Sequence, residues 1–199
     1  LFEKSGHWKH YRENMFFSQG GEESFAVRPM NCPGSTLVYR SQQRSYRNLP
    51  LRLAELGLVH RRELSGVLHG LFRVNAFTID DAHIFCTEDQ IEEEISGCIA
   101  LILRIYKTFG FSEVEISLST RPKDCLGSEA VWEKATRGLK AALLKNGIEY
   151  SLNEGGGAFY GPKIDFEITD SIGRQWQCGT IQLDFQMPER FGLGYAGSD

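Results

Sequence analysis

Residues 59–86 read VHRRELSGVLHGLFRVNAFTIDDAHIFC, and this stretch predicts the element around which the chain is organised. Arg61 and Glu63 have the same parity, so on a strand their side chains point the same way. A polar loop with two glycines follows, and residues 72–86 read as a second strand. The side chains expected on one face of that strand are those of Arg73, Phe77, Ile79, Asp81, His83 and Phe85. The stretch therefore predicts a β-hairpin with a chemically mixed face.

The mixture of side chains on this face suits a phosphorylated, planar ligand better than a hydrophobic core. Arginine holds a phosphate with two parallel hydrogen bonds, an aromatic ring stacks on a base, and a carboxylate accepts from an exocyclic amine. A solvated face with weak ion pairs is the common alternative for such charges. Because Phe77, Ile79 and Phe85 share the face with the charged groups, the pattern favours the wall of a cleft.

The composition is that of an ordinary globular domain, or of a large piece of one, at 199 residues with 41% hydrophobic and 24% charged residues. No apolar run approaches the roughly 20 residues that cross a membrane. The sequence shows no signal peptide, and because it starts at Leu1 without an initiator methionine, we interpret it as cut from a longer chain. The five widely spaced cysteines, without a Cys-x-x-Cys pair, predict a reducing compartment. A net charge of −4 gives no global attraction to nucleic acid, although arginines concentrate between residues 40 and 62.

Local signals in the first half of the chain predict short elements followed by one long helix. We expect strands near residues 15–17 and 24–29, a helix over 35–46 and an extended segment at 49–53. Thr87-x-x-Gln90 is a capping box, so a long helix begins there. Isoleucines then recur at helical spacing until Gly110 ends the helix.

The second half predicts a helix among several strands. Ser128 caps a helix that runs to about residue 145. The strands are expected at residues 113–119, 148–152, 164–168 and 174–187, with a hairpin turn at 170–173. The glycines at 155–157 are not a dinucleotide-binding loop, because their spacing does not fit and no helix follows. Antiparallel pairs with helices packed to one side make an α+β fold.

Arg61-x-Glu63, a loop and then Arg73-x-x-x-Phe77 resemble motif 2 of the class II aminoacyl-tRNA synthetases. Four further stretches resemble the threonyl-tRNA synthetases: MNCPG at 30–34, DDAHIF at 80–85, YGPK at 160–163 and WQCGTIQLDF at 176–185. The resemblance implies a class II synthetase-type, mostly antiparallel sheet flanked by helices. It also implies that residues 1–199 are the central part of an aminoacylation catalytic domain, with no editing or anticodon-binding domain among them.

The resemblance implies a role for each site residue in forming threonyl-adenylate and transferring threonine to tRNA. It assigns ATP binding to Arg61, Glu63, Arg73, Phe77, Gln177 and Thr180, catalysis to Arg61, Arg73, Lys163 and His7, and threonine contacts to Met30, Asp81, Tyr160 and Gln182. Attack of a carboxylate on the α-phosphorus needs alignment and a cage for negative charge rather than an enzyme nucleophile. Arginine and the Mg²⁺ that accompanies ATP supply that cage.

The resemblance also implies a zinc ion held by Cys32 and His83, with a third protein ligand beyond Asp199. A thiolate and an imidazole suit zinc, and an open position on the metal can take the amine and hydroxyl of threonine. Valine lacks the hydroxyl, so such a site rejects it by a factor that can reach ~10⁴. Serine has the same chelating pair, so we expect editing by a separate domain.

Two departures from the family pattern leave an alternative open. Asn75 and Ile79 stand where an arginine and a glutamine are common, which favours a synthetase-like paralogue that binds tRNA or a partner without full catalysis. A zinc hydrolase using His83 and Cys86 is weaker, because residues three apart on a strand point to opposite faces. Otherwise the resemblance implies a ligase that acts on ATP, threonine and threonine tRNA. It also implies a homodimer that works in the cytoplasm, or in an organelle, and does not bind membranes.

Overall fold

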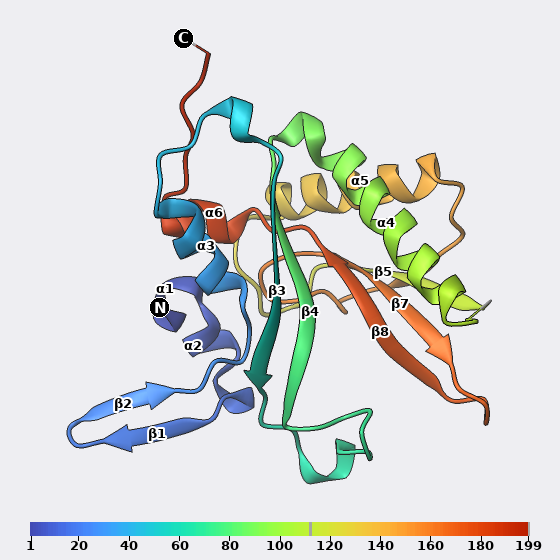
Figure 1. Ribbon diagram of the computed structural model, residues 1–199, viewed down its shortest axis with the longest axis horizontal. Helices are drawn as coiled ribbons and strands as arrows, with labels where there is room; N and C mark the ends of the chain where they lie inside the picture. The colour runs from blue at the N-terminus through green and yellow to red at the C-terminus, as the bar shows by residue number, and fades with distance from the viewer. Residues whose placement is uncertain (112, 199) are drawn as a thin grey trace. The chain divides into compact units, whose positions relative to one another are not determined.

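The computed structural model describes residues 1–111 and 113–198, which form two compact units (Figure 1). Unit 1 comprises Leu1–Phe85 together with Arg190–Asp199, and unit 2 comprises Cys86–Glu189. The predicted α+β class is confirmed, since each unit combines helices with mainly antiparallel strands. Within the described residues, no helix has the length and apolar character required to cross a membrane. All five cysteines are described, and none forms a disulfide.

Unit 1 contains the predicted hairpin, with β3 (Leu51–His60) antiparallel to β4 (Ala76–Phe85). The expected extended segment at 49–53 is the beginning of β3 rather than a separate element. Pro50 precedes the strand because proline has no N–H for the ladder. The strands are shorter at the loop end than predicted, so Arg61, Glu63 and Arg73 lie in the connection, which includes a 3-10 turn (Ser65–Val67). Their orientation is therefore set by loop contacts, not by strand parity.

The predicted helix at 35–46 is wrong at both ends. Helix α3 (Cys32–Arg40) begins at Cys32, with proline in its first turn, where the missing N–H costs no hydrogen bond. It ends at Arg40, and a 3-10 turn (Tyr46–Asn48) follows, capped by Ser45. The helix N-terminus thus carries Cys32 itself.

The N-terminal part of unit 1 is built from short elements (Figure 1). These are α1 (Phe2–Ser5), α2 (His7–His10), a 3-10 turn (Arg12–Asn14) and the hairpin of β1 (Phe17–Gly20) with β2 (Glu23–Ala26). Both expected strands are present, with ends that differ from the predicted ones by one to three residues. Gly21, with φ 65°, makes the turn between them, a conformation that costs glycine little.

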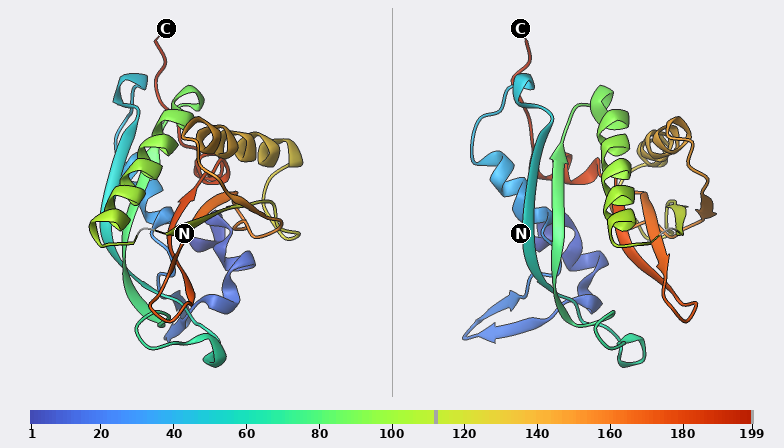
Figure 2. Two further views of the ribbon diagram at one scale, coloured as in Figure 1. Left: turned by 90° about the vertical axis from the view of Figure 1, so that its right-hand side faces the viewer. Right: turned by 45° about the vertical axis from the view of Figure 1, so that its right-hand side comes forward.

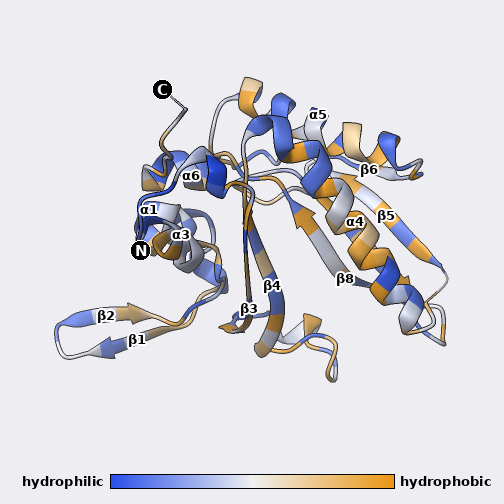
Figure 3. Cartoon of the chain, turned by 45° about the horizontal axis from the view of Figure 1, so that its top comes forward, coloured by the Kyte–Doolittle hydropathy of each residue, from blue (hydrophilic) through white to orange (hydrophobic). Residues whose placement is uncertain are grey.

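The two long helices of unit 2 form where local signals predicted them. The Thr87–Gln90 capping box is present, and the Thr87 N–H donates to Gln90 Oε1 at 3.0 Å. A 3-10 turn (Glu88–Gln90) leads into α4 (Ile91–Thr108). The Ser128 hydroxyl accepts the Val131 N–H and caps α5 (Glu129–Lys145). Along α4, Figure 3 shows hydrophobic residues interleaved with hydrophilic ones, as expected of a helix with one buried side.

The sheet of unit 2 has the strand order β6-β5-β7-β8. Its strands are β5 (Val114–Ser119), β6 (Ser151–Asn153), β7 (Lys163–Thr169) and β8 (Gln175–Gln182). Only β5 and β6 pair in parallel. One face packs against α4 and α5 through a core that includes Ile99, Leu118, Leu139, Leu143, Ile164 and Phe166 (Figure 2, right). The opposite face therefore carries the polar side chains of the same strands.

The expected strand at 174–187 is too long, because it ends at Gln182 and a short helix follows. Helix α6 (Gln186–Phe191) begins after Asp184, whose Oδ1 accepts the N–H groups of Gln186 and Met187 at 2.6 and 3.0 Å. An aspartate in this position caps a helix by satisfying its first amides. The expected strand at 148–152 is likewise displaced, to Ser151–Asn153.

Candidate functional site

The predicted mixed face of β4 is confirmed by the alternation of exposure along the strand. The odd-numbered residues from Phe77 to Phe85 are half-buried, whereas the even-numbered residues from Ala76 to Ala82 are exposed. The register places buried Val59 opposite Phe77, so the shielded side of β4 continues onto β3. The ionisable side chains of this face thus lie in a partly sheltered place.

Arg61 is held beside Phe77 although it lies beyond the end of β3. Its Nε donates to the Pro29 carbonyl at 3.0 Å, and its backbone N–H donates to the Asn75 carbonyl at 2.8 Å. The guanidinium carbon is 5.2 Å from the centroid of the Phe77 ring, within cation–π range. A fixed guanidinium beside an aromatic ring can hold a phosphate next to a stacked base.

Glu63 and Arg73 form an ion pair across the loop, with Arg73 Nη2 at 3.2 Å from Glu63 Oε2. The Glu63 side chain is 10% exposed and that of Arg73 is 56% exposed. An ion pair with one solvated partner contributes at most ~1 kcal/mol, so a ligand can replace it. The Glu63 N–H donates to Asn75 Oδ1 at 3.1 Å, which gives Asn75 a structural role in this loop.

Asp81 is held by a residue that the sequence reasoning did not single out. Asn31 is 1% exposed, and its Nδ2 donates to Asp81 Oδ2 at 2.9 Å. Asp81 Oδ1 lies 4.0 Å from His83 Nδ1. Among the described residues Asn31 Oδ1 has no hydrogen-bond partner, and an unsatisfied buried acceptor costs ~1–3 kcal/mol. The available signal was a short amide next to Cys32 in the MNCPG stretch.

Gly57 provides the space that Asn31 occupies. A Cβ atom at Gly57 would lie 2.2 Å from Asn31 Nδ2 and 2.6 Å from its Cγ. Such distances are far below van der Waals contact, and the side chain they involve is short and buried. A glycine at this position of β3 is therefore required for Asn31 to reach Asp81.

The Asn31–Asp81 hydrogen bond links the segment that carries Cys32 to the strand that carries His83. That bond joins the residue before Cys32 to the residue two before His83 on the same face of β4. A thiolate and an imidazole are preferred zinc ligands, but protein zinc sites use three or four. Residues 1–111 and 113–198 contain no group of three or more Cys, His, Asp or Glu placed to hold a metal ion. The pair fits part of a zinc site that needs a further ligand.

His7 is fully buried, and both of its ring nitrogens lie close to a neighbouring side chain. Nδ1 lies 2.8 Å from Ser5 Oγ, and Nε2 lies 3.1 Å from Met30 Sδ. Burial lowers the pKa of His7 to about 4, with a smaller contribution from the charge of Arg61. His7 is therefore neutral near pH 7, and it links the first helices to the MNCPG stretch.

In unit 2, three predicted site residues converge on Asp165, a buried residue of β7 that the sequence reasoning missed. Lys163 Nζ lies 2.6 Å from Asp165 Oδ2, and Gln177 Nε2 donates to Oδ1 at 2.6 Å. The Thr180 hydroxyl donates to the same Oδ1 at 3.1 Å. Asp165 is 3% exposed. Its signal in the sequence was weak, because an acid in an alternating strand normally faces solvent.

A β-bulge brings Gln177 and Thr180 to one face. Three residues apart, they would point to opposite faces of a regular strand. The pairing of β7 with β8 shifts between Phe166 and Glu167, so Gln177 pairs with Glu167 and Thr180 with Asp165. The additional residue in β8 is Cys178. The approach of both Gln177 and Thr180 to Asp165 therefore depends on this bulge.

Tyr160 precedes β7 in unit 2, and Gln182 ends β8 opposite the first residue of β7. Gln182 Nε2 donates to the Gly161 carbonyl at 3.2 Å, and Gln182 pairs with Lys163 in the sheet. Tyr160 is buried, and its ring centroid is 4.8 Å from that of Phe159. These contacts fix both residues near Lys163, on the strand that carries Asp165.

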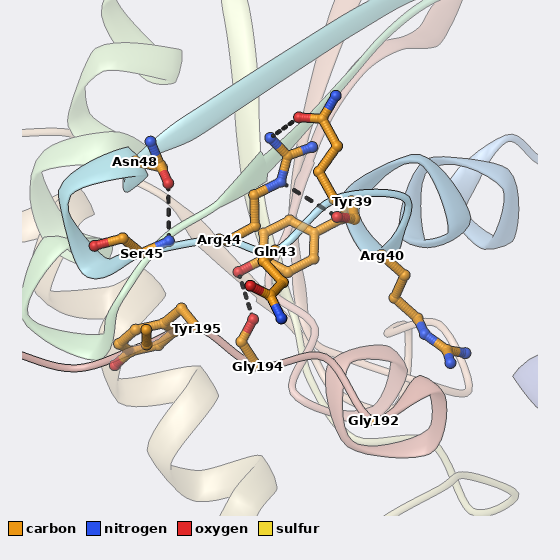
Figure 4. A pocket seen from close by; sticks show the side chains of 11 residues that line it. Tyr39, Arg40, Gln43, Arg44, Ser45, Asn48, Gly192, Gly194 and Tyr195 are labelled. Carbon is orange, nitrogen blue, oxygen red and sulfur yellow. Dashed lines mark hydrogen bonds between the residues drawn. The ribbon is translucent and has the colours of Figure 1, made fainter.

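Unit 1 also contains a pocket of about 560 Å³ that the sequence reasoning did not predict (Figure 4). It is lined by residues that include Tyr39, Arg40, Arg44, Asn48 and Tyr195. The Arg44 guanidinium donates to the Tyr39 carbonyl at 3.2 Å and to Gln42 Oε1 at 3.1 Å. The polar groups shown in Figure 4 mainly bond one another, so this geometry does not point to a ligand.

Comparison with known proteins identifies the class. The tRNA synthetase class II core domain (G, H, P, S and T) matches residues 15–199, so the chain belongs to this family. The prolyl-tRNA synthetase of Cryptosporidium parvum shares the fold, with a TM-score of 0.64 over 93% of this chain and 32% of that chain at 16% identity.

More similar relatives are threonine–tRNA ligases, which confirms the predicted resemblance. Those of Acetivibrio thermocellus and Clostridium tetani are 65% and 63% identical over all 199 residues. The chain spans 31% of the length of each. The RNA binding domain of threonyl-tRNA synthetase from Cryptosporidium parvum Iowa II has a TM-score of 0.94 and 49% identity, over 99% of this chain and 49% of that chain.

Proposed function

We propose that the protein containing this chain activates threonine with ATP and transfers it to the 3′ end of threonine tRNA. The observation that carries the proposal is the environment of Asp81: a half-buried carboxylate with an acceptor oxygen to spare, held by Asn31 and 4.0 Å from His83. Identity of 60% or more to threonine–tRNA ligases supports the choice of amino acid. In this proposal Asp81 accepts the threonine hydroxyl.

The loop and strand residues of unit 1 bind the nucleotide in this proposal. Arg61 holds the α-phosphate and the threonine carboxylate, and Phe77 stacks on adenine. Glu63 leaves its pairing with Arg73 to accept from the adenine amine, which frees Arg73 for the γ-phosphate. Because the pair is weak and partly solvated, the exchange has little cost. These charges stabilise the negative charge that develops at the α-phosphorus.

In unit 2 the proposal assigns Gln177 and Thr180 to the ribose and Lys163 to the phosphates, with Mg²⁺ bound to ATP. Tyr160 and Gln182, like Met30 in unit 1, contact threonine. Cys32, His83 and one further ligand would hold a zinc ion, which would act as a Lewis acid toward the amine and hydroxyl of threonine. His7, neutral at physiological pH, assists transfer to the tRNA. We further infer a homodimer that works in the cytoplasm.

The departures at Asn75 and Ile79 do not require a paralogue without catalysis. Asn75 stabilises the loop by accepting the Glu63 N–H, and Ile79 lies on the regular part of β4. The relatives named as ligases also favour an active enzyme.

Threonine-dependent exchange of pyrophosphate into ATP by the complete, zinc-loaded protein tests the proposal. We expect exchange with threonine, exchange with serine, and none above background with valine, because valine cannot supply the hydroxyl. Arg61→Ala is expected to abolish exchange while circular dichroism stays unchanged. The proposal is wrong if the zinc-loaded protein binds tRNA and catalyses no exchange.

A further inference from the structure

The carboxylate of Asp165 connects all four strands of the unit 2 sheet on the face opposite the helices. Its two oxygens accept hydrogen bonds from Lys163 (2.6 Å), Ser119 (2.8 Å), Gln177 (2.6 Å) and Thr180 (3.1 Å). Ser119 lies on β5, Lys163 on β7, and the other two donors on β8. From β6, Asn153 Nδ2 donates to Ser119 Oγ at 3.1 Å. A single buried acid thus organises every polar group of this face that the proposed function uses for the nucleotide.

The hydrogen-bonding capacity of Asp165 is filled by these partners. A carboxylate has about four acceptor sites on its two oxygens. Two donors share each oxygen: Lys163 and Ser119 share Oδ2, and Gln177 and Thr180 share Oδ1. Because no acceptor site is left for a ligand, Asp165 can influence a bound nucleotide only through the side chains that it holds.

The four donors also constrain one another, which makes the arrangement rigid. Gln177 Nε2 lies 2.7 Å from Thr180 Oγ1 as well as 2.6 Å from Asp165. Lysine and glutamine are among the side chains with the largest rotamer entropy, so fixing them before the ligand arrives removes a cost from binding. The bulge at Cys178 places Gln177 within reach of the same carboxylate as Thr180.

We propose that Asp165 is a positioning residue for nucleotide binding, which preorders Lys163, Gln177 and Thr180 and does not itself touch ATP. The inference rests on the proposed function and adds to it the group that organises the ribose and phosphate contacts. Threonine recognition is centred on Asp81, and Gln182 donates to the Gly161 carbonyl rather than to Asp165. Loss of Asp165 therefore acts on ATP and not on threonine.

The test compares Asp165→Asn with the unaltered protein in steady-state pyrophosphate exchange and in direct titration with ATP. Asparagine keeps the shape of aspartate but replaces one acceptor oxygen with a donor, so it opposes two of the four donors. We expect the KM and Kd for ATP to rise roughly tenfold, with the KM for threonine unchanged. Ser119→Ala, which removes one donor and no proposed ligand contact, is expected to produce a smaller rise.

Two further variants separate positioning from general damage. Ile164→Val alters the residue between Lys163 and Asp165 on the opposite, helix-covered face of β7. It is expected to lower Tm with no change in the KM for ATP. The double variant Asp165→Asn with Gln177→Ala is expected to be little worse for ATP than Asp165→Asn alone, since both changes remove the same preordered contact.

Each outcome decides the inference. Independent effects that multiply in the double variant would overturn the positioning role, as would an equal rise of both KM values in Asp165→Asn. If the unaltered protein binds ATP and Asp165→Asn binds it equally well, the positioning role is wrong and the proposed function stands. If the unaltered, zinc-loaded protein binds no ATP, both fail.

Discussion

Asp81 in unit 1 and Asp165 in unit 2 show how differently the same chemical group is used. Asp81 accepts one hydrogen bond, from Asn31 at 2.9 Å, and its side chain is 23% exposed. The Asp165 side chain is 4% exposed and accepts from four donors. The first carboxylate keeps an acceptor oxygen open, whereas the second has none. Counting the occupied acceptor sites therefore separates a group that faces a ligand from one that holds a sheet together.

The contrast predicts that loss of Asp165 mainly lowers stability, whereas loss of Asp81 mainly lowers activity with threonine. Removing a saturated, buried carboxylate leaves its donors without partners, including the Lys163 ammonium. Removing an open carboxylate leaves one amide without a partner but takes away a contact with the ligand. The four predictions that follow test this division.

The largest effect is expected for Asp165→Ala. Because it leaves the half-buried Lys163 ammonium and three further donors without their acceptor, it should lower the free energy of unfolding of unit 2 by ~3–5 kcal/mol. Denaturant unfolding, together with amide exchange of β7 and β8, measures this. Glu167→Ala is the matched control, because Glu167 lies on the same face of the same strand but is half-buried and has no side-chain hydrogen bond to the described residues; it should change stability by less than ~0.5 kcal/mol. A loss in Asp165→Ala no larger than in the control would contradict the scaffold role.

The next effect is expected in activity, for Asp81→Asn. The Asn31 amide can still donate to the new carboxamide, so we expect folding to be nearly unchanged. The acceptor for the threonine hydroxyl is weakened, so kcat/KM for threonine should fall ~10²–10³-fold while the KM for ATP stays the same. Asp80→Asn, the neighbouring acid on the exposed face of β4, is the control. Normal threonine activation by Asp81→Asn would show that another group reads the hydroxyl.

The two units are expected to respond in opposite directions to pH. The pKa of His7 is lowered to about 4 by burial, so between pH 6.5 and 4 the unfolded chain binds the proton that the folded unit excludes. Unit 1 therefore loses stability as pH falls through this window, by up to roughly 3 kcal/mol.

In unit 2, shielding of the carboxyl from water raises the pKa of Asp184 to about 7, although the residue as a whole is partly exposed. Below pH 7 the folded unit binds that proton, so unit 2 gains stability.

Amide exchange at pH 7.5 and 5, corrected for intrinsic exchange rates, measures the two responses separately. His7→Asn should remove the acid sensitivity of unit 1. Asp184→Asn, which keeps an oxygen to cap α6, should remove the gain in unit 2. Parallel responses of the two units that persist in both variants would show that other groups control their pH dependence.

The smallest effects are expected at two strand glycines. Gly57→Ala places a Cβ 2.2 Å from the Asn31 amide, which is short and cannot move aside, so we expect a loss of ~1–3 kcal/mol and a higher KM for threonine. In Gly179→Ala the nearest atom is Tyr106 Oη at 2.6 Å, at the end of a longer side chain that can shift. Thermal unfolding of both variants tests this order, and a larger loss at Gly179 would reverse it.

Several elements could be predicted because their signals are local. The Thr87–Gln90 capping box and Ser128 each fix a helix start within a few residues, and both predictions are confirmed. The alternation along β4 correctly identified its sheltered face. By contrast, α3 begins at Cys32 and not near residue 35, because the position of Pro33 permits either start and tertiary packing selects one.

The sequence by itself determined the type of fold, the sheltered face of β4 and the residues with the chemistry for a phosphorylated ligand, since periodicity and side-chain chemistry are properties of neighbouring residues. Only the tertiary structure decided that Asn31 holds Asp81 and that Asp165 holds Lys163, Gln177 and Thr180. Apart from Lys163, which lies two residues from Asp165 on the same strand, these contacts join segments distant in the chain, and the contact of Gln177 also depends on a bulge. Strand pairing sets the register, and no local pattern in β8 specifies where the additional residue lies.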